Sequence, residues 1–123
     1  MGNYTFSKEE RLTKEKSIQE LFNRGSSFYL YPFKVFFMPN PDQAYAFHQV
    51  LVSVSKKNFK RAVDRNLIKR RMREAYRLNK ALIPAQNRLL LAYIYSAKEI
   101  LPSGQLHDRF VKTFKKLVYV EKG

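Results

Sequence analysis

Residues 61–77 read RAVDRNLIKRRMREAYR, and this stretch carries the strongest structural signal in the chain. When successive residues are placed about 100° apart on a helical wheel, apolar and basic side chains separate onto different sides. The residues on the apolar side are Leu67, Ile68, Met72, Ala75 and Leu78. Those on the basic side are Arg61, Arg65, Lys69, Arg70, Arg73 and Arg77. The pattern predicts an amphipathic helix over residues 61–80.

The four-residue spacing of the basic side chains is unfavourable for an isolated helix, because like charges at positions i and i+4 repel each other. Residues 56–80 hold eleven basic residues and two acidic ones, so they carry +9 of the chain's net charge of +14. A basic helix face is most often simply solvated. Here the unrelieved spacing favours an external polyanion, and the forked guanidinium group of arginine is well suited to phosphate oxygens.

The rest of the chain predicts a small sheet with helices packed on it. A helix is expected after Thr13 with Gly25 ending it in a left-handed conformation, and another after Pro102. Residues 28–38 and 45–55 are rich in β-branched and aromatic residues and predict an antiparallel pair of strands. Residues 89–95, LLLAYIY, predict a central strand that is covered on both faces. The fold class is therefore α+β, a mostly antiparallel sheet with about three helices in the order α-β-β(-β)-α-β-α.

Side chains alternate between the two faces of a strand, which divides residues 33–38 into two sets. Phe33, Val35 and Phe37 share one apolar face, for which a place in the core is expected. Lys34 and Phe36 share the other face with Met38, and the lysine indicates that this second face is partly wet.

Length and composition indicate one domain over residues 1–123, with about five flexible residues at each end. The absence of cysteine and of an N-terminal apolar stretch predicts a cytoplasmic protein, and the charge predicts a nucleic acid as partner. We find no metal-ligand spacing, phosphate-binding loop or nucleophile motif, so no catalytic residue, metal ligand or cofactor is expected on the protein itself. A structural ribosomal protein, an RNA chaperone and a DNA-binding regulator are the alternatives that composition leaves open.

The stretch from Ser55 to Arg77 contains the dipeptides RN, KR and RE, each separated from the next by two residues and preceded by Ser-Lys-Lys. This stretch resembles the signature of the bacterial ribonuclease P protein component. Phe6, Lys8, Arg11-Leu12, Phe22 and Gly25 are similar to the opening of that family in type and spacing. The resemblance implies a left-handed β-α-β crossover. It also implies a subunit that assists a catalytic RNA, acting with Mg²⁺, in cutting precursor tRNA to the mature 5′ end.

The resemblance further implies two RNA-binding surfaces. Residues expected to contact the catalytic RNA are Lys60, Arg61, Arg65, Asn66, Lys69, Arg70, Arg73 and Arg77. Residues expected to line a cleft for the single-stranded 5′ leader of precursor tRNA are Phe22, Lys34, Phe36, Lys56 and Lys57. From helical spacing alone Phe22 would be assigned to the core, so its place in the cleft depends on the resemblance. Ile18, Leu67 and Arg71 depart from the commonest family pattern.

Overall fold

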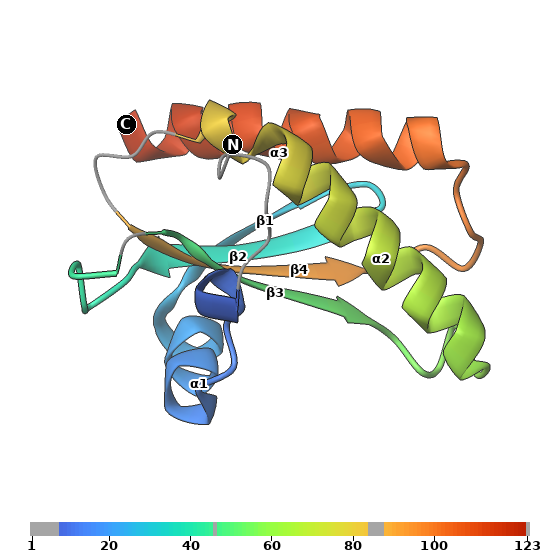
Figure 1. Cartoon of the computed structure of the whole chain (residues 1–123), viewed down its shortest axis with the longest axis horizontal. Helices are drawn as coiled ribbons and strands as arrows, with labels where there is room; N and C mark the ends of the chain where they lie inside the picture. Colours follow the sequence, from blue (N-terminus) through green and yellow to red (C-terminus); the bar gives the residue numbers. More distant parts are fainter. Residues whose placement is uncertain (1–7, 46, 84–87, 123) are drawn as a thin grey trace.

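A computed structural model describes residues 8–45, 47–83 and 88–122 of the chain. The elements are the short 3-10 helix η2 (Lys8–Glu10), α1 (Glu15–Arg24), β1 (Ser26–Leu30), β2 (Phe33–Pro39), β3 (Gln49–Val54), α2 (Ala62–Asn79), η3 (Lys80–Leu82), β4 (Leu89–Tyr95) and α3 (Ser103–Lys122). This order confirms the expected α+β class (Figure 1). The expected flexible N-terminal residues lie outside the described residues.

The four strands form one sheet in the order β1-β2-β4-β3. β2 pairs with β1 and β4 in antiparallel fashion, whereas β3 and β4 are parallel and are connected through α2. The predicted antiparallel pairing of residues 28–38 with 45–55 is therefore wrong, because β4 lies between β2 and β3. β4 is apolar on both faces and nearly all of it is buried. A strand of this kind is most stable in the interior of the sheet, where both of its faces can be covered. The handedness of the crossover stays a prediction.

Residues 28–38 form a hairpin rather than a single strand. The chain reverses at Tyr31 and Pro32, and β1 then pairs with β2 from Ser26 opposite Phe37 to Leu30 opposite Phe33. The turn at Tyr31 and Pro32 was not predicted, because the flanking residues are aromatic or aliphatic and lack the Asn-Gly or Asp-Gly signal of a tight hairpin.

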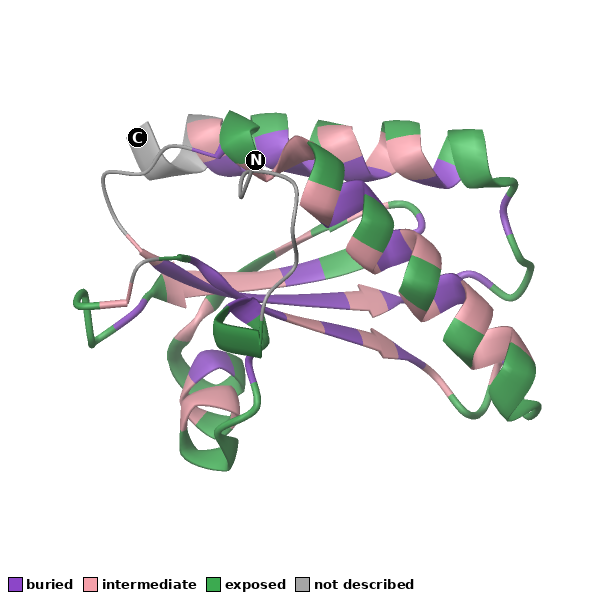
Figure 2. Ribbon diagram, viewed as in Figure 1, coloured by how far each residue is buried: buried purple, intermediate pink, exposed green. Residues whose placement is uncertain are grey.

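The helices cover the sheet unequally. α2 and α3 lie together on one face, while α1 lies on the other, near one end of the strands (Figure 1). The main core is between the sheet and the α2–α3 layer, and it includes Phe33, Tyr93, Tyr95, Phe110 and Phe114. A smaller cluster of Leu12, Leu21, Leu90 and Ala92 holds α1 against the other face. Buried positions in Figure 2 are accordingly concentrated in β4 and on the inner sides of α2 and α3.

Gly25 ends α1, but not in the predicted left-handed conformation. Its φ and ψ angles are −70° and 157°, which is extended backbone open to any residue. The need for glycine is instead steric, since a Cβ atom here would lie 2.4 Å from the carbonyl oxygen of Leu21. The absent side chain lets the chain turn directly from α1 into β1.

The buried side of α2 is rotated relative to the predicted apolar side. Ile68, Met72 and Ala75 are buried as expected, but Leu78 is 41% exposed and Tyr76 is almost fully buried. Tyr76 packs against Phe114 of α3 with ring centroids 6.0 Å apart. Tyr76 was not among the residues assigned to the apolar side, so the contact side of α2 differs from the one that the sequence indicated.

Arg71 has a structural contact within the chain. Its Nη1 atom donates a hydrogen bond of 3.1 Å to the carbonyl oxygen of Leu101, just before α3. At the other end of α2, Lys80 pairs with the buried carboxylate of Glu10 at 2.6 Å, which ties the N-terminal segment to the helix. No helix among the described residues is both long and apolar enough to cross a lipid bilayer.

Candidate nucleic-acid interface

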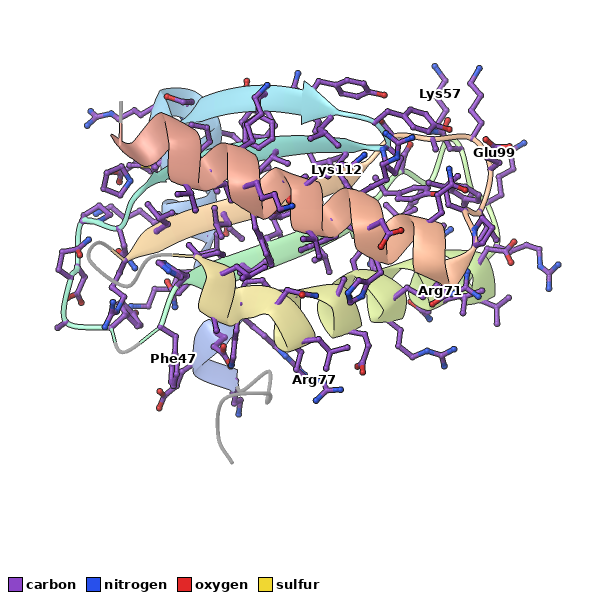
Figure 3. The ribbon with its side chains drawn as sticks, turned by 90° about the horizontal axis from the view of Figure 1, so that it is seen from above. Phe47, Lys57, Arg71, Arg77, Glu99 and Lys112 are labelled. Carbon is purple, nitrogen blue, oxygen red and sulfur yellow. The ribbon has the colours of Figure 1, made fainter. Side chains whose placement is uncertain are left out.

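The basic side of α2 lies along the flank of the helix that faces away from α3. Figure 3 shows Arg77 on this flank and Arg71 on the opposite one, toward α3. Arg65, Lys69, Arg73 and Arg77 are all half-buried, which means that their stems lie against the protein while their charged ends reach its surface. We call these four residues and Arg61 the basic ladder.

The two ends of the basic ladder have acidic neighbours within α2. Arg77 forms a hydrogen-bonded ion pair with Glu74, and this contact lowers the pKa of the Glu74 carboxyl group. At the start of the helix, Arg61 Nε is 3.9 Å from Asp64, a loose contact because the arginine side chain is 77% exposed. Exposed pairs of this kind contribute little to stability.

The middle of the basic ladder is not neutralised by the protein. Within the described residues, no ion pair to a carboxylate involves Lys69 or Arg73 of the ladder, or Arg70 on the side toward α3. Burial lowers the pKa of Arg73, and the nearby charge of Arg11 lowers it further. An arginine remains protonated at neutral pH in spite of such a shift. The positive charge in the middle of the ladder is thus left available to an external anion.

Arg65 is placed differently from its neighbours. Its Nη1 atom donates to the carbonyl oxygens of Phe59 and Lys60 at 2.8 and 2.9 Å, so the guanidinium group holds the loop that precedes α2. Part of its predicted RNA-binding capacity is therefore used within the chain. The sequence could not show this, because carbonyl groups of an irregular loop leave no mark in residue type.

Lys60, Arg61, Asn66 and Arg70 are all exposed on or beside the N-terminal half of α2. Arg70 lies toward the α3 side, where it lines a cavity of about 300 Å³ together with Arg71, Glu74, Ala75, Ser103 and His107. The predicted contacts to the catalytic RNA thus extend around the helix rather than along one line.

Arg11 is a basic residue that the sequence analysis did not assign to this surface. Its backbone forms an isolated β-bridge with Val50 of β3, and its charge is close enough to lower the pKa of Arg73. The only indication of its role in the sequence was its position in the N-terminal stretch that is similar to the family, since a single arginine before a leucine forms no periodic pattern. Arg11 therefore places a positive charge near Arg73.

The predicted cleft is on the other face of the sheet, where α1 meets β2. Phe22 of α1 and Phe36 of β2 contact each other edge to face, with centroids 4.8 Å apart. Phe22 is 38% exposed and Phe36 is half-buried, so neither residue belongs to the fully buried core. Lys34 Nζ lies 5.4 Å from the centre of the Phe36 ring. The structure thus brings together three of the five residues predicted for the cleft.

The remaining two cleft residues, Lys56 and Lys57, are exposed in the loop after β3. The backbone N–H of Lys57 donates to Ser55 Oγ at 3.1 Å, and the amide of Asn58 donates to the carbonyl oxygen of Ser96 after β4. These bonds hold the loop beside the end of the sheet that α1 leaves uncovered. In the described part of the chain, neither lysine forms a cation-π contact or a hydrogen bond with Phe22 or Phe36.

The two candidate surfaces are on opposite faces of the sheet. α2 packs over β3, which is an edge strand, so the basic ladder lies beside that edge. The loop of residues 55–61 connects the end of β3 to the start of α2 and carries basic residues from one surface to the other. A polyanion could follow this path without crossing a carboxylate-rich region. Among the described residues, no three acidic or histidine side chains gather so as to hold a metal ion.

Comparison with known proteins identifies the family. The model of the family described as Ribonuclease P matches residues 6–118. This chain belongs to the Ribonuclease P protein family. Ribonuclease P protein component of Porphyromonas gingivalis is 45% identical over 82 residues, which are 67% of this chain and 60% of that protein. The protein component of Chromohalobacter salexigens is 34% identical over 117 residues, or 95% of this chain and 88% of that protein.

The fold agrees with the same family. The solved structure of the RNase P protein from Thermotoga maritima matches with a TM-score of 0.73 and 25% sequence identity, covering 87% of this chain and 96% of that one. The match to the Porphyromonas relative spans about 60% of that protein's length, so it says nothing of the remainder. Helices α1 and α2 and strand β2 all lie within the residues that the family model matches.

Proposed function

We propose that this protein is the RNA-binding subunit of a bacterial ribonuclease P, which removes the 5′ leader from precursor tRNA. In this proposal the basic ladder binds the catalytic RNA, and the cleft between α1 and the sheet holds the leader. The RNA, with Mg²⁺, performs the cleavage, while the protein contributes binding and no catalytic side chain. The subunit acts in the cytoplasm with the catalytic RNA and precursor tRNA as its partners.

The observation that supports this role most strongly is the unneutralised middle of the basic ladder. Lys69 and Arg73 of the ladder, and Arg70 on the side toward α3, have no carboxylate ion-pair partner within the described residues, and Arg11 is close enough to lower the pKa of Arg73. Such an arrangement costs free energy in the isolated protein. An RNA that places phosphates along the helix removes the repulsion and releases its own condensed counterions, and both effects favour binding.

The cleft is suited to unpaired nucleotides of any sequence. Phe22 and Phe36 present partly exposed ring surface, and Lys34 places an ammonium group beside it. Base stacking on an aromatic ring contributes about 1–3 kcal/mol per base and does not depend on base identity. A leader that differs among precursor tRNAs needs this kind of recognition.

Reconstitution is the direct test of the proposed function. The purified chain is added to a bacterial ribonuclease P RNA at low Mg²⁺, and the rate of 5′ processing of a precursor tRNA is measured. We expect the protein to restore cleavage that the RNA alone performs poorly under these conditions. No stimulation by the protein, or cleavage by the protein without RNA, would overturn the proposal.

Lys69→Ala tests the basic ladder within the same assay, because it removes one unpaired charge. Its affinity for the catalytic RNA should fall, and the slope of log K against log salt should decrease in magnitude by about 1. Lys115→Ala on the exposed side of α3 removes the same charge elsewhere and serves as the matched control. Equal changes in the two variants would show a general charge effect and no specific role for α2.

Phe36→Ala tests the cleft. The affinity of the reconstituted complex for precursor tRNA should fall by about tenfold, which corresponds to one stacked base, while its affinity for mature tRNA stays the same. Phe47→Ala, at another partly exposed phenylalanine, is the control. Equal losses of affinity for precursor and mature tRNA would show that the leader does not bind in the cleft.

A structural ribosomal protein or an RNA chaperone is the alternative that charge and size leave open. Such a protein would bind many RNAs through the same basic ladder, without requiring a leader-dependent contribution from Phe36. The two roles therefore differ in one measurement, the ratio of affinities for precursor and mature tRNA.

A further inference from the structure

The half of the α1 face that the helix leaves uncovered carries a second aromatic ring, Tyr29 of β1. Tyr29 is the direct cross-strand partner of Lys34, and opposite residues of an antiparallel pair point to the same face of the sheet. Its neighbour Phe28 packs against the main core on the other face, which agrees with this orientation. At 56% exposure, Tyr29 is the most exposed aromatic residue in the described part of the chain.

The Tyr29 ring is held by hydrogen bonding. The Tyr29 hydroxyl oxygen is 3.3 Å from Ser96 Oγ, and the same serine is fixed by two hydrogen bonds to the carbonyl oxygen of Pro32, from its backbone N–H at 2.9 Å and from its Oγ at 3.1 Å. The ring is thus anchored at both ends, through its backbone in β1 and through its hydroxyl group beyond the end of β4. An exposed ring that is fixed in this way loses little conformational entropy when a ligand stacks on it.

Lys34 neighbours both aromatic positions of this face, because it is opposite Tyr29 across the β1–β2 pair and two residues before Phe36 along β2. Phe36 is two residues farther along β2, which makes it the diagonal neighbour of Tyr29 at a spacing of about 7–8 Å between backbone positions. The Lys34 ammonium group is 5.4 Å from the Phe36 ring centre and is exposed to solvent. The lysine is therefore the corner residue beside both rings, where its ammonium group is placed to bind the phosphate that joins two bases stacked on them.

We propose that Tyr29 is a second stacking site for single-stranded RNA, so that the sheet binds two successive leader nucleotides, one base on Phe36 and one on Tyr29, with the intervening phosphate on Lys34. This inference rests on the proposed function and extends it beyond the residues assigned to the cleft. The ligand class is unpaired RNA without base preference, because each contact uses a ring face or a phosphate.

The charge of the surroundings fits RNA as the occupant. Ser96 also accepts, through its carbonyl oxygen, a hydrogen bond from Asn58 in the loop that carries Lys56 and Lys57. Ser96 thereby links Tyr29 to the loop that carries Lys56 and Lys57. Figure 3 shows Lys57 and Glu99 at the same end of the molecule, where Glu99 accepts a hydrogen bond from the neighbouring Tyr31 hydroxyl and so belongs to a separate contact.

The experiment uses the complex of this protein with a bacterial ribonuclease P RNA and a series of precursor tRNAs whose leaders lengthen one nucleotide at a time. Equilibrium affinity is measured for the unaltered chain, Tyr29→Ala and Phe36→Ala. We expect Tyr29→Ala to weaken binding by about five- to tenfold, but only above a threshold leader length that differs from the threshold for Phe36→Ala by one nucleotide. Tyr29→Phe keeps the ring and should stay within about twofold of the unaltered chain.

Tyr31→Ala is the matched control, since it removes another exposed tyrosine of the same hairpin whose hydroxyl group bonds to Glu99. A fluorescent base, 2-aminopurine, placed at the threshold position provides a second measurement, because stacking on Tyr29 should quench it and Tyr29→Ala should restore its emission. Thermal unfolding of each variant verifies that the fold is kept.

The outcomes separate this inference from the proposed function. If Phe36→Ala shows a leader-dependent loss and Tyr29→Ala behaves like Tyr31→Ala, the second stacking site is wrong and the cleft stands. If the loss of affinity depends on leader length in neither Phe36→Ala nor Tyr29→Ala, the second stacking site and the leader-binding cleft are both wrong. A loss with Tyr29→Ala that is the same at every leader length would also overturn the inference, since it would indicate a contact outside the leader.

Discussion

The two faces of the sheet use the same four strands but differ in how completely they are closed. On the α2–α3 face, Tyr93 and Phe110 stack at 4.3 Å and are fully buried. On the α1 face, Phe36 is half-buried and Tyr29 is mostly exposed. The reason is helix length, because α2 and α3 have 18 and 20 residues whereas α1 has 10, about 15 Å of helix. One face is therefore closed by packing, and the other leaves aromatic surface exposed.

The largest effect that this comparison predicts is from Phe110→Ala on the closed face. Phe110 contacts the rings of Phe33, Tyr93 and Phe114, so its removal leaves a cavity that rigid neighbours cannot fill. We expect a loss of about 3–5 kcal/mol in the free energy of unfolding, to be measured by urea denaturation. A loss below about 1 kcal/mol would show that the closed face is less tightly packed than its geometry indicates.

Leu21→Ala probes the smaller cluster beneath α1. Leu21 is fully buried there, but the cluster has only three other buried members, and the surrounding open face can relax around the gap. The expected loss is about 2–3 kcal/mol, and it should fall mainly on α1. Hydrogen exchange should show faster exchange in Glu15–Arg24 with little change in β4. Equal acceleration in both elements would contradict the separation of the two faces.

Thr113→Val tests the buried polar contact of the closed face. Tyr93 hydroxyl and Thr113 Oγ1 are 2.6 Å apart, and burial raises the pKa of Tyr93, so its hydroxyl group stays protonated. The substitution leaves that hydroxyl group without its partner and should cost about 1–2 kcal/mol in thermal or urea unfolding. Tyr93→Phe removes the hydroxyl group itself and should cost less. The reverse order would show that the Tyr93 hydroxyl group finds another hydrogen-bond partner when Thr113 Oγ1 is absent.

Lys34→Gln should have the smallest effect on stability, because Lys34 is exposed on the open face. We expect the free energy of unfolding to change by less than about 0.5 kcal/mol. Binding of precursor tRNA, by contrast, should lose about one unit of its salt slope, in line with one lost phosphate contact. A large loss of stability together with an unchanged slope would assign Lys34 to the structure rather than to the binding surface.

The amino-acid sequence alone indicated the local features of this protein. The alternation at Phe33, Lys34 and Val35, the continuous apolar run of β4 and the amphipathic character of α2 follow from side-chain periodicity, which needs only near neighbours along the chain. The charge on α2 and the family-like spacing of its arginines likewise indicated RNA as a partner. These features were predictable because each is confined to one element.

Tertiary structure decided how those elements combine. It placed β4 between β2 and β3, turned Tyr76 inward, directed Arg65 to the carbonyl groups of its own loop and set Tyr29 opposite Lys34. Each of these outcomes depends on pairing between residues that are separated in the chain, and residue type at one position contains no record of which distant strand or helix will cover it. For the same reason the open half of the α1 face, where we place the leader, becomes visible only in the folded chain.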